Sequence, residues 1–316
     1  MASEFEIIDR YFTREARGAL LGIGDDCALI ASMKTIAVST DMLIEGTHFF
    51  RDDDPFLLGR KALAVNLSDM AAMGAMPRWA TLALALPSAE ESWLDAFSKG
   101  FMMQAERYCV DLVGGDTTRG PLAICVQIMG EVGEALALKR SGAMAGDEIW
   151  VSGTLGDAAL GLAHLQKRIA LDEGDAASCL EALRNPVPRV DLGIRLAGIS
   201  RCAIDISDGF CADLGHILER SKVSAIVEAD SIPLSEAVEK YRENPVAAHA
   251  ILAGGDDYEL CFTAPVERSE EILALGKSLS MRLTRVGKIT AGAGLTLLDA
   301  QGKAIAMEET GYEHFR

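Results

Sequence analysis

The sequence lacks the motifs by which nucleotide-binding enzymes are most often found. It has no Walker A motif, because Gly276-Lys277-Ser278 has no earlier glycine at the required spacing, and it has no G-x-G-x-x-G or G-x-S-x-G segment. These absences exclude the P-loop, the dinucleotide-binding fingerprint and the nucleophile elbow of α/β-hydrolases. A phosphate site in this chain would therefore depend on metal ions, glycine-rich turns and isolated arginines.

Basic residues are also scarce. The 316 residues include 30 Lys and Arg against 47 Asp and Glu, for a net charge of −17. A nucleic-acid-binding protein needs a basic face, so this balance argues against a nucleic-acid partner. An anionic small molecule remains compatible with the charge, provided that bound cations reverse the local field.

Long apolar runs and paired cysteines are missing too. No run approaches the roughly 18 residues of a membrane span, and the first residues, Met1 to Glu6, are acidic where a signal peptide is basic and then apolar. The seven cysteines are odd in number and form no C-x-x-C. We expect reduced, buried thiols in a cytoplasmic protein, with no membrane association.

The order of strand-like and helix-like patterns predicts an α/β protein of two domains. A chain of 316 residues is typical of about two domains. A connection rich in Gly and Ala follows residue 137, and we place the domain boundary there. We therefore expect an N-terminal α/β domain at 1–137 and a C-terminal α/β domain at 138–316. Strands are predicted at 35–41, 81–86, 122–128, 149–151, 203–206, 225–228, 258–263, 283–286 and 295–298, with helices between them and a short apolar piece at 112–113.

Aspartates beside glycines and apolar residues are the main positive signal. The central example is Leu21 to Leu29, where two adjacent carboxylates follow two glycines; in an extended segment only one of them can face a common site, and we select Asp26. Asp69 interrupts the apolar stripe of a predicted helix. An isolated buried carboxylate is costly, so either this end of the helix opens into a site or a cation lies there. Similar stretches contain Asp41, Asp116, Asp205 and Asp256-Asp257.

Two chemical interpretations of these aspartates are possible. Asp often serves as a turn or cap residue, but six such stretches, each next to an apolar element, favour a cluster of two or three metal ions. The segment from Asp205 to Asp208 is predicted at a strand-to-helix turn, where free backbone N–H groups favour an anion. His48 either pairs with a substrate phosphate or closes its loop, and Arg119 and Arg140 lie in Gly-flanked loops that suit phosphate contact.

Taken together, the motifs resemble those of the thiamine-monophosphate kinase family. That family belongs to a superfamily with aminoimidazole ribonucleotide synthetase, selenophosphate synthetase and a hydrogenase maturation factor. The resemblance spans residues 5 to 315. The segments that carry it are GIGDDCALI, STDMLIEGTHFF, ALAVNLSDMAAMGAMP, GGDTTRGPL, KRSGAMAGD, VSGTLGDAALGL, AIDISDGFCADLGHIL, GGDDYELCFT and GYEHF.

The resemblance implies a function, a fold and a set of site residues. It implies ATP-dependent phosphorylation of thiamine monophosphate to thiamine diphosphate by direct Mg²⁺-assisted phosphoryl transfer, with several Mg²⁺ ions. It also implies that the N-terminal α/β domain, 1–137, binds metal and ATP and forms a shared barrel-like sheet in a homodimer. Its metal ligands would be Asp26, Ser39, Thr40, Asp41, Asp69, Asp116, Asp205 and Asp208; its ATP contacts Gly115, Asp116, Arg140 and Ser207; and its substrate contacts His48, Asp256, Asp257, Glu259 and Tyr312.

The sequence departs from the family pattern at two positions and leaves other functions to be tested. Asn185 replaces the usual Arg ahead of Pro-x-Pro-Arg, and Phe210 replaces the usual Leu after Asp-Gly. The alternatives are another ATP-using member of the superfamily, such as one like aminoimidazole ribonucleotide synthetase, a metal-dependent phosphohydrolase, and a nucleotide sensor without catalysis. The sequence does not identify which acid between Asp256 and Glu259 meets the substrate.

Overall fold

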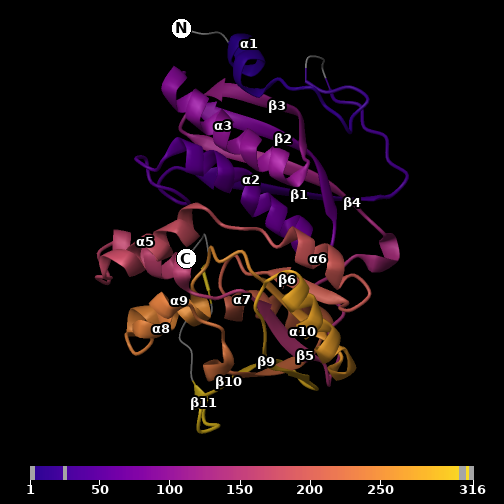
Figure 1. Cartoon of the computed structure of the whole chain (residues 1–316), viewed down its shortest axis with the longest axis vertical. Coiled ribbons are helices and arrows are strands. Elements are labelled where there is room, and N and C mark those ends of the chain that lie inside the picture. The colour runs from indigo at the N-terminus through magenta and orange to yellow at the C-terminus, as the bar shows by residue number, and fades with distance from the viewer. Residues whose placement is uncertain (1–3, 24–26, 306–310, 313–316) are drawn as a thin grey trace. The chain divides into compact units, whose positions relative to one another are not determined.

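The computed structural model describes residues 4–23, 27–305, 311 and 312 and divides the chain into two compact units. The N-terminal unit comprises Met1–Met70 and Ala75–Glu134, and the C-terminal unit comprises Ala71–Gly74 and Ala135–Arg316. Each unit has its own sheet (Figure 1). The chain is mixed α/β with two domains, as the sequence predicted. None of the helices in the described part of the chain is long and apolar enough to cross a bilayer.

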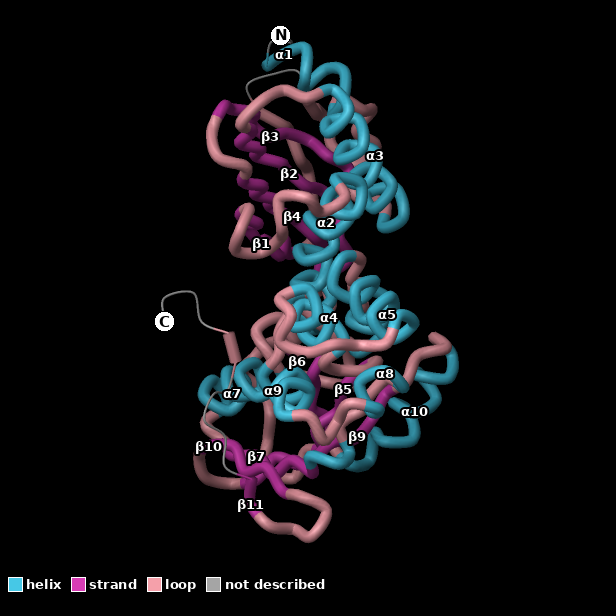
Figure 2. The backbone as a smooth tube through the Cα atoms, turned by 90° about the vertical axis from the view of Figure 1, so that its left-hand side faces the viewer, coloured by secondary structure: helices cyan, strands magenta, loops and turns pink. Residues whose placement is uncertain are grey.

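The N-terminal unit is a four-stranded sheet with helices on one face. The strand order is β1-β4-β2-β3; β4 is antiparallel to both β1 and β2, and β2 is parallel to β3. Helices α2 and α3 both lie on the same side of this sheet (Figures 1 and 2). The elements are α1 (Glu4–Ile7), η1 (Ile8–Phe12), β1 (Thr35–Ile44), α2 (Pro55–Ala72), β2 (Met76–Leu86), α3 (Glu91–Tyr108), β3 (Asp111–Arg119), β4 (Ala123–Val132) and η2 (Glu134–Leu136).

The other face of this sheet is open and partly apolar. Leu82, Leu84 and Leu86 alternate along β2 and are buried, as expected for the face covered by helices. On β1 the exposed positions include Val38 (57%) and Met42 (51%). Strand β1 is also an edge strand, so the N–H and C=O groups along its outer side are open to pairing with another strand.

The structure corrects the expectation for β3. The sequence showed only a short apolar piece at 112–113 ahead of two glycines, but β3 continues through Gly114, Gly115 and Asp116 to Arg119. A Cβ at Gly115 would lie 1.9 Å from the Leu82 carbonyl oxygen. The glycine therefore permits close approach of β3 to β2 and does not mark a loop.

The C-terminal unit is built on a seven-stranded mixed sheet of order β11-β10-β7-β9-β5-β8-β6. Its strands are β5 (Glu148–Ser152), β6 (Cys202–Asp205), β7 (Ser224–Glu228), β8 (Leu260–Ala264), β9 (Leu283–Thr290), β10 (Gly294–Leu298) and β11 (Ala304–Ile305). Its helices are α4 (Asp157–Leu165), α5 (Glu173–Arg184), α6 (Val190–Leu196), η3 (Ala229–Ser231), α8 (Glu236–Lys240), α9 (Pro245–Ala253), η4 (Val266–Arg268), α10 (Ser269–Ser278) and α7 (Phe210–Ser221).

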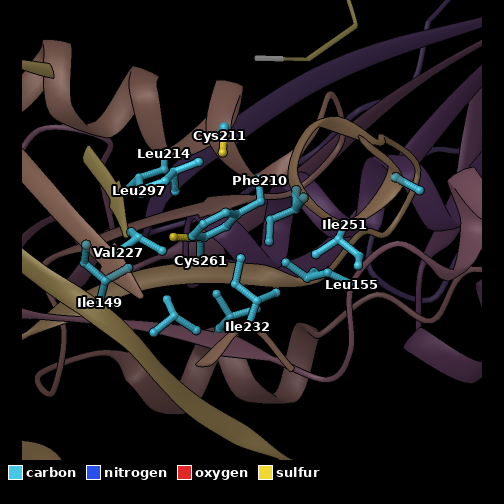
Figure 3. Packing of buried hydrophobic residues seen from close by; sticks show 14 of the residues in the cluster. Ile149, Leu155, Phe210, Cys211, Leu214, Val227, Ile232, Ile251, Cys261 and Leu297 are labelled. Atoms are coloured by element: carbon cyan, nitrogen blue, oxygen red, sulfur yellow. The ribbon is translucent and has the colours of Figure 1, made fainter. Parts of the chain in front are cut away.

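Helix α7 supplies much of the apolar contact in this unit. Phe210, Leu214 and Ile217 are spaced by three or four residues, which predicts one apolar stripe of a helix, and each is 0% exposed. Phe210 lies beside Cys261 of β8 in the buried cluster (Figure 3). Burial of each such side chain contributes about 1.5–3 kcal/mol. This packing fixes α7 against the sheet and so fixes the turn that precedes it.

Two local expectations were wrong. Ser88-Ala89-Glu90-Glu91 has the sequence of a capping box and predicts a helix start at Ser88, yet α3 begins at Glu91 and has no side-chain cap. The pattern of apolar residues did not predict α9, although Asn244 accepts a hydrogen bond from Val246 N and Pro245 occupies the first turn. An N-cap Asn followed by Pro is a helix-start signal that could have identified α9.

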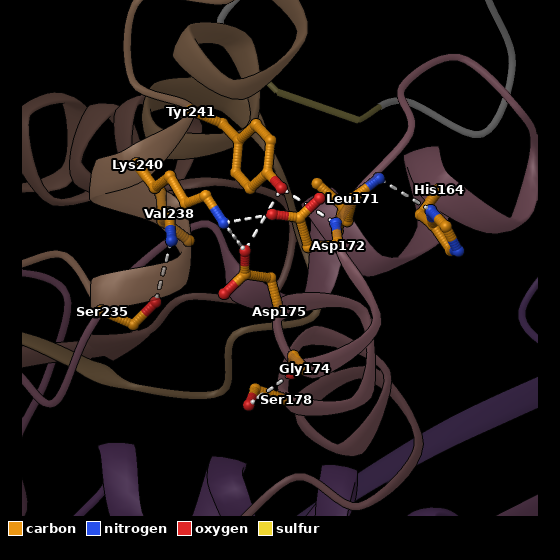
Figure 4. Close-up of polar contacts among 10 residues, drawn as sticks. All are labelled: His164, Leu171, Asp172, Gly174, Asp175, Ser178, Ser235, Val238, Lys240 and Tyr241. Carbon is orange, nitrogen blue, oxygen red and sulfur yellow. Dashed lines mark hydrogen bonds and ion pairs between the residues drawn. The ribbon is translucent and has the colours of Figure 1, made fainter.

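Helix α8 is tied to α5 by polar contacts at the surface of this unit (Figure 4). Lys240 Nζ lies 2.5 Å from Asp172 Oδ2 and 2.7 Å from Asp175 Oδ2. Tyr241 Oη accepts from Asp172 N at 2.9 Å and donates to Asp175 at 3.2 Å. Exposed ion pairs contribute about 0–1 kcal/mol, so this group orients α8 more than it stabilises the unit.

Candidate active site

The turn between β6 and α7 joins several predicted site residues of the C-terminal unit. Asp205, 4% exposed, is the last residue of β6, and Ser207 and Asp208 are half-buried in the turn. Ser207 O accepts from Asp256 N at 2.9 Å, and Asp208 O accepts from Tyr312 N at 2.9 Å. Main-chain hydrogen bonds thus bring the predicted metal and ATP residues beside two predicted substrate residues.

Close backbone contacts on three sides support this turn. Gly209 has φ 129°, and a Cβ there would lie 2.7 Å from the Ala253 carbonyl carbon. A Cβ at Gly255 would lie 2.3 Å from Ser207 O, and one at Gly311 would lie 2.8 Å from Asp208 O. The glycines of these motifs are therefore required for the approach of three chain segments.

The structure corrects one chemical expectation for the turn. The sequence predicted free N–H groups for an external anion, but Asp213 Oδ2 accepts from the N–H groups of Ser207, Asp208 and Gly209 at 3.0, 3.1 and 3.1 Å. Burial, and then the charge of Asp208, raises the pKa of the Asp213 carboxyl to about 7, while the three hydrogen bonds act in the opposite direction. A carboxylate of the chain already occupies the position that a phosphate would take.

The segment that contacts the turn carries backbone strain. Asp256 has φ 69° and Tyr258 has φ 50°, in the left-handed region that non-glycine residues seldom adopt. Tyr258 Oη donates to Asp256 Oδ1 at 3.1 Å. Such strain costs of order 1–3 kcal/mol per residue and clusters at functional sites. It is thus a reason, independent of motif resemblance, to place function here.

Asp257 faces the start of helix α4. Its carboxylate accepts from Gly156 N, with Oδ2 at 2.9 Å and Oδ1 at 3.1 Å. Burial raises the pKa of the Asp257 carboxyl well above its usual range, and the neighbouring charges of Asp157 and Glu259 raise it further. Asp257 therefore caps the N-terminus of α4, although it is distant from that helix in sequence.

Glu259 lies in a buried ion pair. The residue is 5% exposed, and Arg189 donates to both of its carboxylate oxygens, with Nε 2.7 Å from Oε2. Ser152 Oγ donates to the same Oε2 at 2.5 Å and accepts from Leu260 N at 2.9 Å. This bidentate arrangement connects β5, β8 and the residue before α6.

In the N-terminal unit, β1 and α2 bring three predicted metal ligands together. Ser39 Oγ donates to Asp69 Oδ2, and Asp41 N donates to Asn66 Oδ1 at 3.2 Å. Asn66 is fully buried and also donates to Ala62 O at 3.1 Å. The Asp69 that interrupts the apolar stripe of α2 therefore faces the side of β1 that carries Ser39 and Asp41.

Two other predicted ligands lie elsewhere in this unit. Thr40 is exposed between Ser39 and Asp41, so it points to the opposite face of β1. Asp116, exposed on β3, is paired across the sheet with Ala83. Strands β1 and β3 form opposite edges of the sheet. Three strand spacings of about 4.8 Å separate them by roughly 14 Å, so one copy of this sheet does not bring Asp41 and Asp116 to one ion.

The remaining predicted residues have varied settings. His48 Nδ1 accepts from Ile44 N at 3.0 Å, which is the loop-closing role. Arg140 has an exposed side chain, and its carbonyl accepts from Ser221 Oγ at 3.0 Å. Asp26 lies outside the described residues. Within the described ranges, which leave out 24–26, no three His, Cys, Asp or Glu side chains surround one metal position.

The sequence analysis missed Asp213, Arg189 and Asn66. A signal for Asp213 was present, because it lies three residues after Phe210 on the apolar stripe of α7, as Asp69 does on α2. Arg189 and Asn66 had no such signal, since their partners Glu259 and Asp41 are distant in sequence.

Both halves of the chain match models of known domains. Residues 24–132 match the AIR synthase related protein N-terminal domain, and residues 144–300 match the AIR synthase related protein C-terminal domain. With the two α/β units and the acid-rich turns, these matches define the class: a two-domain protein of the AIR synthase related fold.

Full-length relatives narrow this class. The chain is 46% identical over 320 residues to thiamine-monophosphate kinase of Salmonella typhimurium, covering 99% of this chain and 98% of the relative. A crystal structure of thiamine-monophosphate kinase from Stenotrophomonas maltophilia K279a has 46% identity, a TM-score of 0.86, and coverage of 95% of this chain and 96% of that chain. A structure described as AaThiL complexed with AMPPCP and TMP has 32% identity, a TM-score of 0.79, and coverage of 99% and 97%. The chain belongs to the thiamine-monophosphate kinase family.

Proposed function

We propose that this protein transfers the γ-phosphoryl group of ATP to the phosphate of thiamine monophosphate, giving thiamine diphosphate and ADP. The observation that carries the proposal is the turn at Ser207 and Asp208, whose carbonyls hold the segments of Asp256 and Tyr312. A relative of 32% identity is described in complex with AMPPCP and TMP, which supports both substrates.

The chemistry needs no general base. A phosphate monoester has a second pKa near 6, so at pH 7 the acceptor is largely a dianion. An acceptor oxygen forms a bond to the γ-phosphorus while the bond to the β,γ-bridging oxygen breaks, and ADP leaves with that electron pair. Phosphoryl transfer of this kind depends on positioning and charge neutralisation. The chain must therefore hold two anions together although its own net charge is −17.

Magnesium is the cation that the donor atoms fit. Mg²⁺ is usually held by one or two carboxylates together with water and substrate phosphates. Asp69 and the Ser39 hydroxyl, which are within hydrogen-bond distance, form one such set of hard oxygen donors. In the C-terminal unit, Asp205 and Asp208 supply further carboxylates at the turn between β6 and α7. When bound, Mg²⁺ would neutralise the phosphate charges, with the side chains of Asp41 and Asp116 as further ligands.

Among the acids at 256–259, we propose that Asp256 meets the thiamine side. Asp257 caps α4 and Glu259 is paired with Arg189, whereas Asp256 is held in a left-handed conformation next to the turn. Asp256→Asn should raise the KM for thiamine monophosphate about tenfold or more and leave the KM for ATP within about threefold, as expected when one charged contact worth about 1.5–3 kcal/mol is lost. An unchanged KM for thiamine monophosphate would reject this assignment.

We also propose that the protein acts as a homodimer through the open face of the N-terminal sheet. Val38 and Met42 expose apolar surface on that face, and Asp116 lies on it at the far edge from β1. A two-fold axis along the strands would place the β3 edge of one copy opposite the β1 edge of the other. Asp116 of one copy could then approach Thr40 of its partner, which lies on the open face of β1, inside a barrel-like pair of sheets.

One assay tests the reaction. Purified protein is incubated with ATP, Mg²⁺ and thiamine monophosphate, and thiamine diphosphate and ADP are quantified by chromatography. Equal amounts of the two products, dependent on acceptor, support the kinase. ADP formed at the same rate without acceptor would indicate the phosphohydrolase, and no turnover would indicate the sensor or a different ATP-using member of the superfamily.

Subunit mixing tests the shared site. Thr40→Val and Asp116→Asn variants are each expected to lose most of the wild-type activity when assayed alone. Mixed dimers that contain one copy of each would have one site free of both substitutions, so mixing after mild dissociation should restore up to about a quarter of wild-type activity per total protein. A wild-type protein that stays monomeric, or the absence of any recovery in mixed dimers, would reject the shared site.

A further inference from the structure

Asp213 is a buried carboxylate for which neither the motifs nor the family resemblance provides a role. It lies in the first turn of α7 and is 3% exposed. Its Oδ2 atom accepts three main-chain hydrogen bonds, from Ser207 N, Asp208 N and Gly209 N. All three donors belong to the turn that carries predicted ligands of metal and ATP.

This arrangement is an anion-binding nest filled from within the chain. The first N–H groups of a helix lack intrahelical partners, and successive N–H groups in such a turn form a concave anion site. In many nucleotide-binding proteins a phosphate fills that position. Here the carboxylate of Asp213 fills it, which makes the turn independent of any bound ligand.

The opposite side of the same turn supports the substrate residues. The carbonyl oxygens of Ile206, Ser207 and Asp208 accept from Tyr258 N at 2.8 Å, Asp256 N at 2.9 Å and Tyr312 N at 2.9 Å. Because the N–H groups point to Asp213 while the carbonyls point to these segments, the orientation of each peptide plane is set from both sides. A change in the N–H contacts would therefore rotate the carbonyls as well.

We propose that Asp213 is a positioning residue, whose carboxylate orients the Ser207–Gly209 turn so that Asp208 and Ser207 can engage magnesium and nucleotide. This role rests on the proposed function, and it differs from simple stabilisation of a helix end. Asp213 touches neither substrate; it acts through the peptide groups of the turn. Loss of its carboxylate acceptor should therefore weaken nucleotide binding and turnover more than it weakens folding.

The test compares the wild type with Asp213→Asn, in which a neutral amide oxygen is a weaker acceptor than the carboxylate and an NH2 group replaces the other oxygen. Amide hydrogen exchange is measured on the ligand-free protein, and binding of AMPPCP with Mg²⁺ is measured by calorimetry. We expect exchange of residues 207–209 to accelerate at least about tenfold, and the Kd and kcat to worsen about 10–100-fold, the range seen when a partner of a metal ligand is removed.

Asp157→Asn is the matched control. Asp157 is 8% exposed, is the first residue of α4 and accepts from Thr154 Oγ1 at 2.8 Å and Ser235 Oγ at 2.6 Å. It is thus a buried acid at another helix start in the same unit. Its substitution should lower the Tm as much as Asp213→Asn does, yet leave exchange of residues 207–209 and the Kd within about threefold.

The possible outcomes are distinct. Unchanged exchange of residues 207–209 in Asp213→Asn, or an equal loss of nucleotide affinity in both variants, would overturn the positioning role. If the wild type makes no thiamine diphosphate but the exchange and AMPPCP results are as expected, the proposed function fails while the role of Asp213 stands. If Asp213→Asn does not fold, Asp213→Ser, which carries no amide, undergoes the same measurements with the same expected result.

Discussion

The Arg189–Glu259 ion pair allows a prediction with a magnitude. The side chain of Glu259 is 6% exposed and that of Arg189 is 23% exposed, and Ser152 supplies the additional hydrogen bond to the carboxylate. Removing one partner of a buried pair typically costs 3–5 kcal/mol, because the other charge remains buried without compensation. Since water reaches part of Arg189, we expect Arg189→Met to cost about 3 kcal/mol, near the lower end of that range.

The double variant separates charge from packing. In Arg189→Met with Glu259→Gln no charge remains, and the Gln side chain can still accept from Ser152. We expect this variant to lose only about 1 kcal/mol, since replacing both members of a buried pair can be nearly neutral. For a unit of this size each kcal/mol corresponds to about 2–4 °C in Tm. The single and double variants should then differ in Tm by roughly 4–8 °C, which urea and thermal unfolding followed by circular dichroism can resolve.

The same pair tests the sequence-based expectation that Glu259 contacts substrate. If its role is the ion pair, the double variant should keep its KM for thiamine monophosphate within about threefold of the wild type, a difference below about 0.7 kcal/mol. A KM raised tenfold would show that Glu259 does reach the substrate. A loss of less than 1 kcal/mol in Arg189→Met, or a double variant no more stable than the single, would refute the buried-charge account.

Three further predictions concern other parts of the chain. Asp69→Asn should reduce kcat at least about 100-fold at saturating Mg²⁺ with little change in Tm, because Asp69 binds Ser39 at the proposed metal position; near-normal kcat would contradict the assignment. Gly209→Ala should cost more than about 2 kcal/mol, since its φ is 129° and its Cβ would meet the Ala253 backbone, and an unchanged unfolding midpoint in urea would show that the turn can move. A hydrogen bond from Ser32, and then the neighbouring Arg78 and Lys34, lower the pKa of the Glu131 carboxyl from 4.5, so the stabilisation by Glu131 is present above pH 4.5 and is lost as the pH falls through the lowered pKa. Glu131→Gln should therefore lower the free energy of unfolding by about 0.5–1 kcal/mol at pH 7 and match the wild type near pH 3. A difference in stability that does not depend on pH would exclude this linkage.

The sequence by itself determined the class of fold, the alternating strands and helices, and the family. Local patterns are sufficient for this, because the apolar stripe of α7 and the alternating leucines of β2 reflect burial that each element must achieve on its own faces. The same logic identified Asp69 as a carboxylate on an apolar face. The motifs around Asp205 and Asp256 also carry local geometry, since their glycines are required by close backbone contacts.

Only the tertiary structure decided which acids are held by hydrogen bonds and ion pairs within the chain. Asp213, Asp257 and Glu259 resemble the other aspartate and glutamate positions in sequence, yet each is held by partners inside the C-terminal unit. Tertiary contacts also placed Asp41 and Asp116 at opposite edges of one sheet. The physical reason is that the energy of a carboxylate depends on the donors and charges around it in space, and a linear pattern does not specify which distant donors will be near.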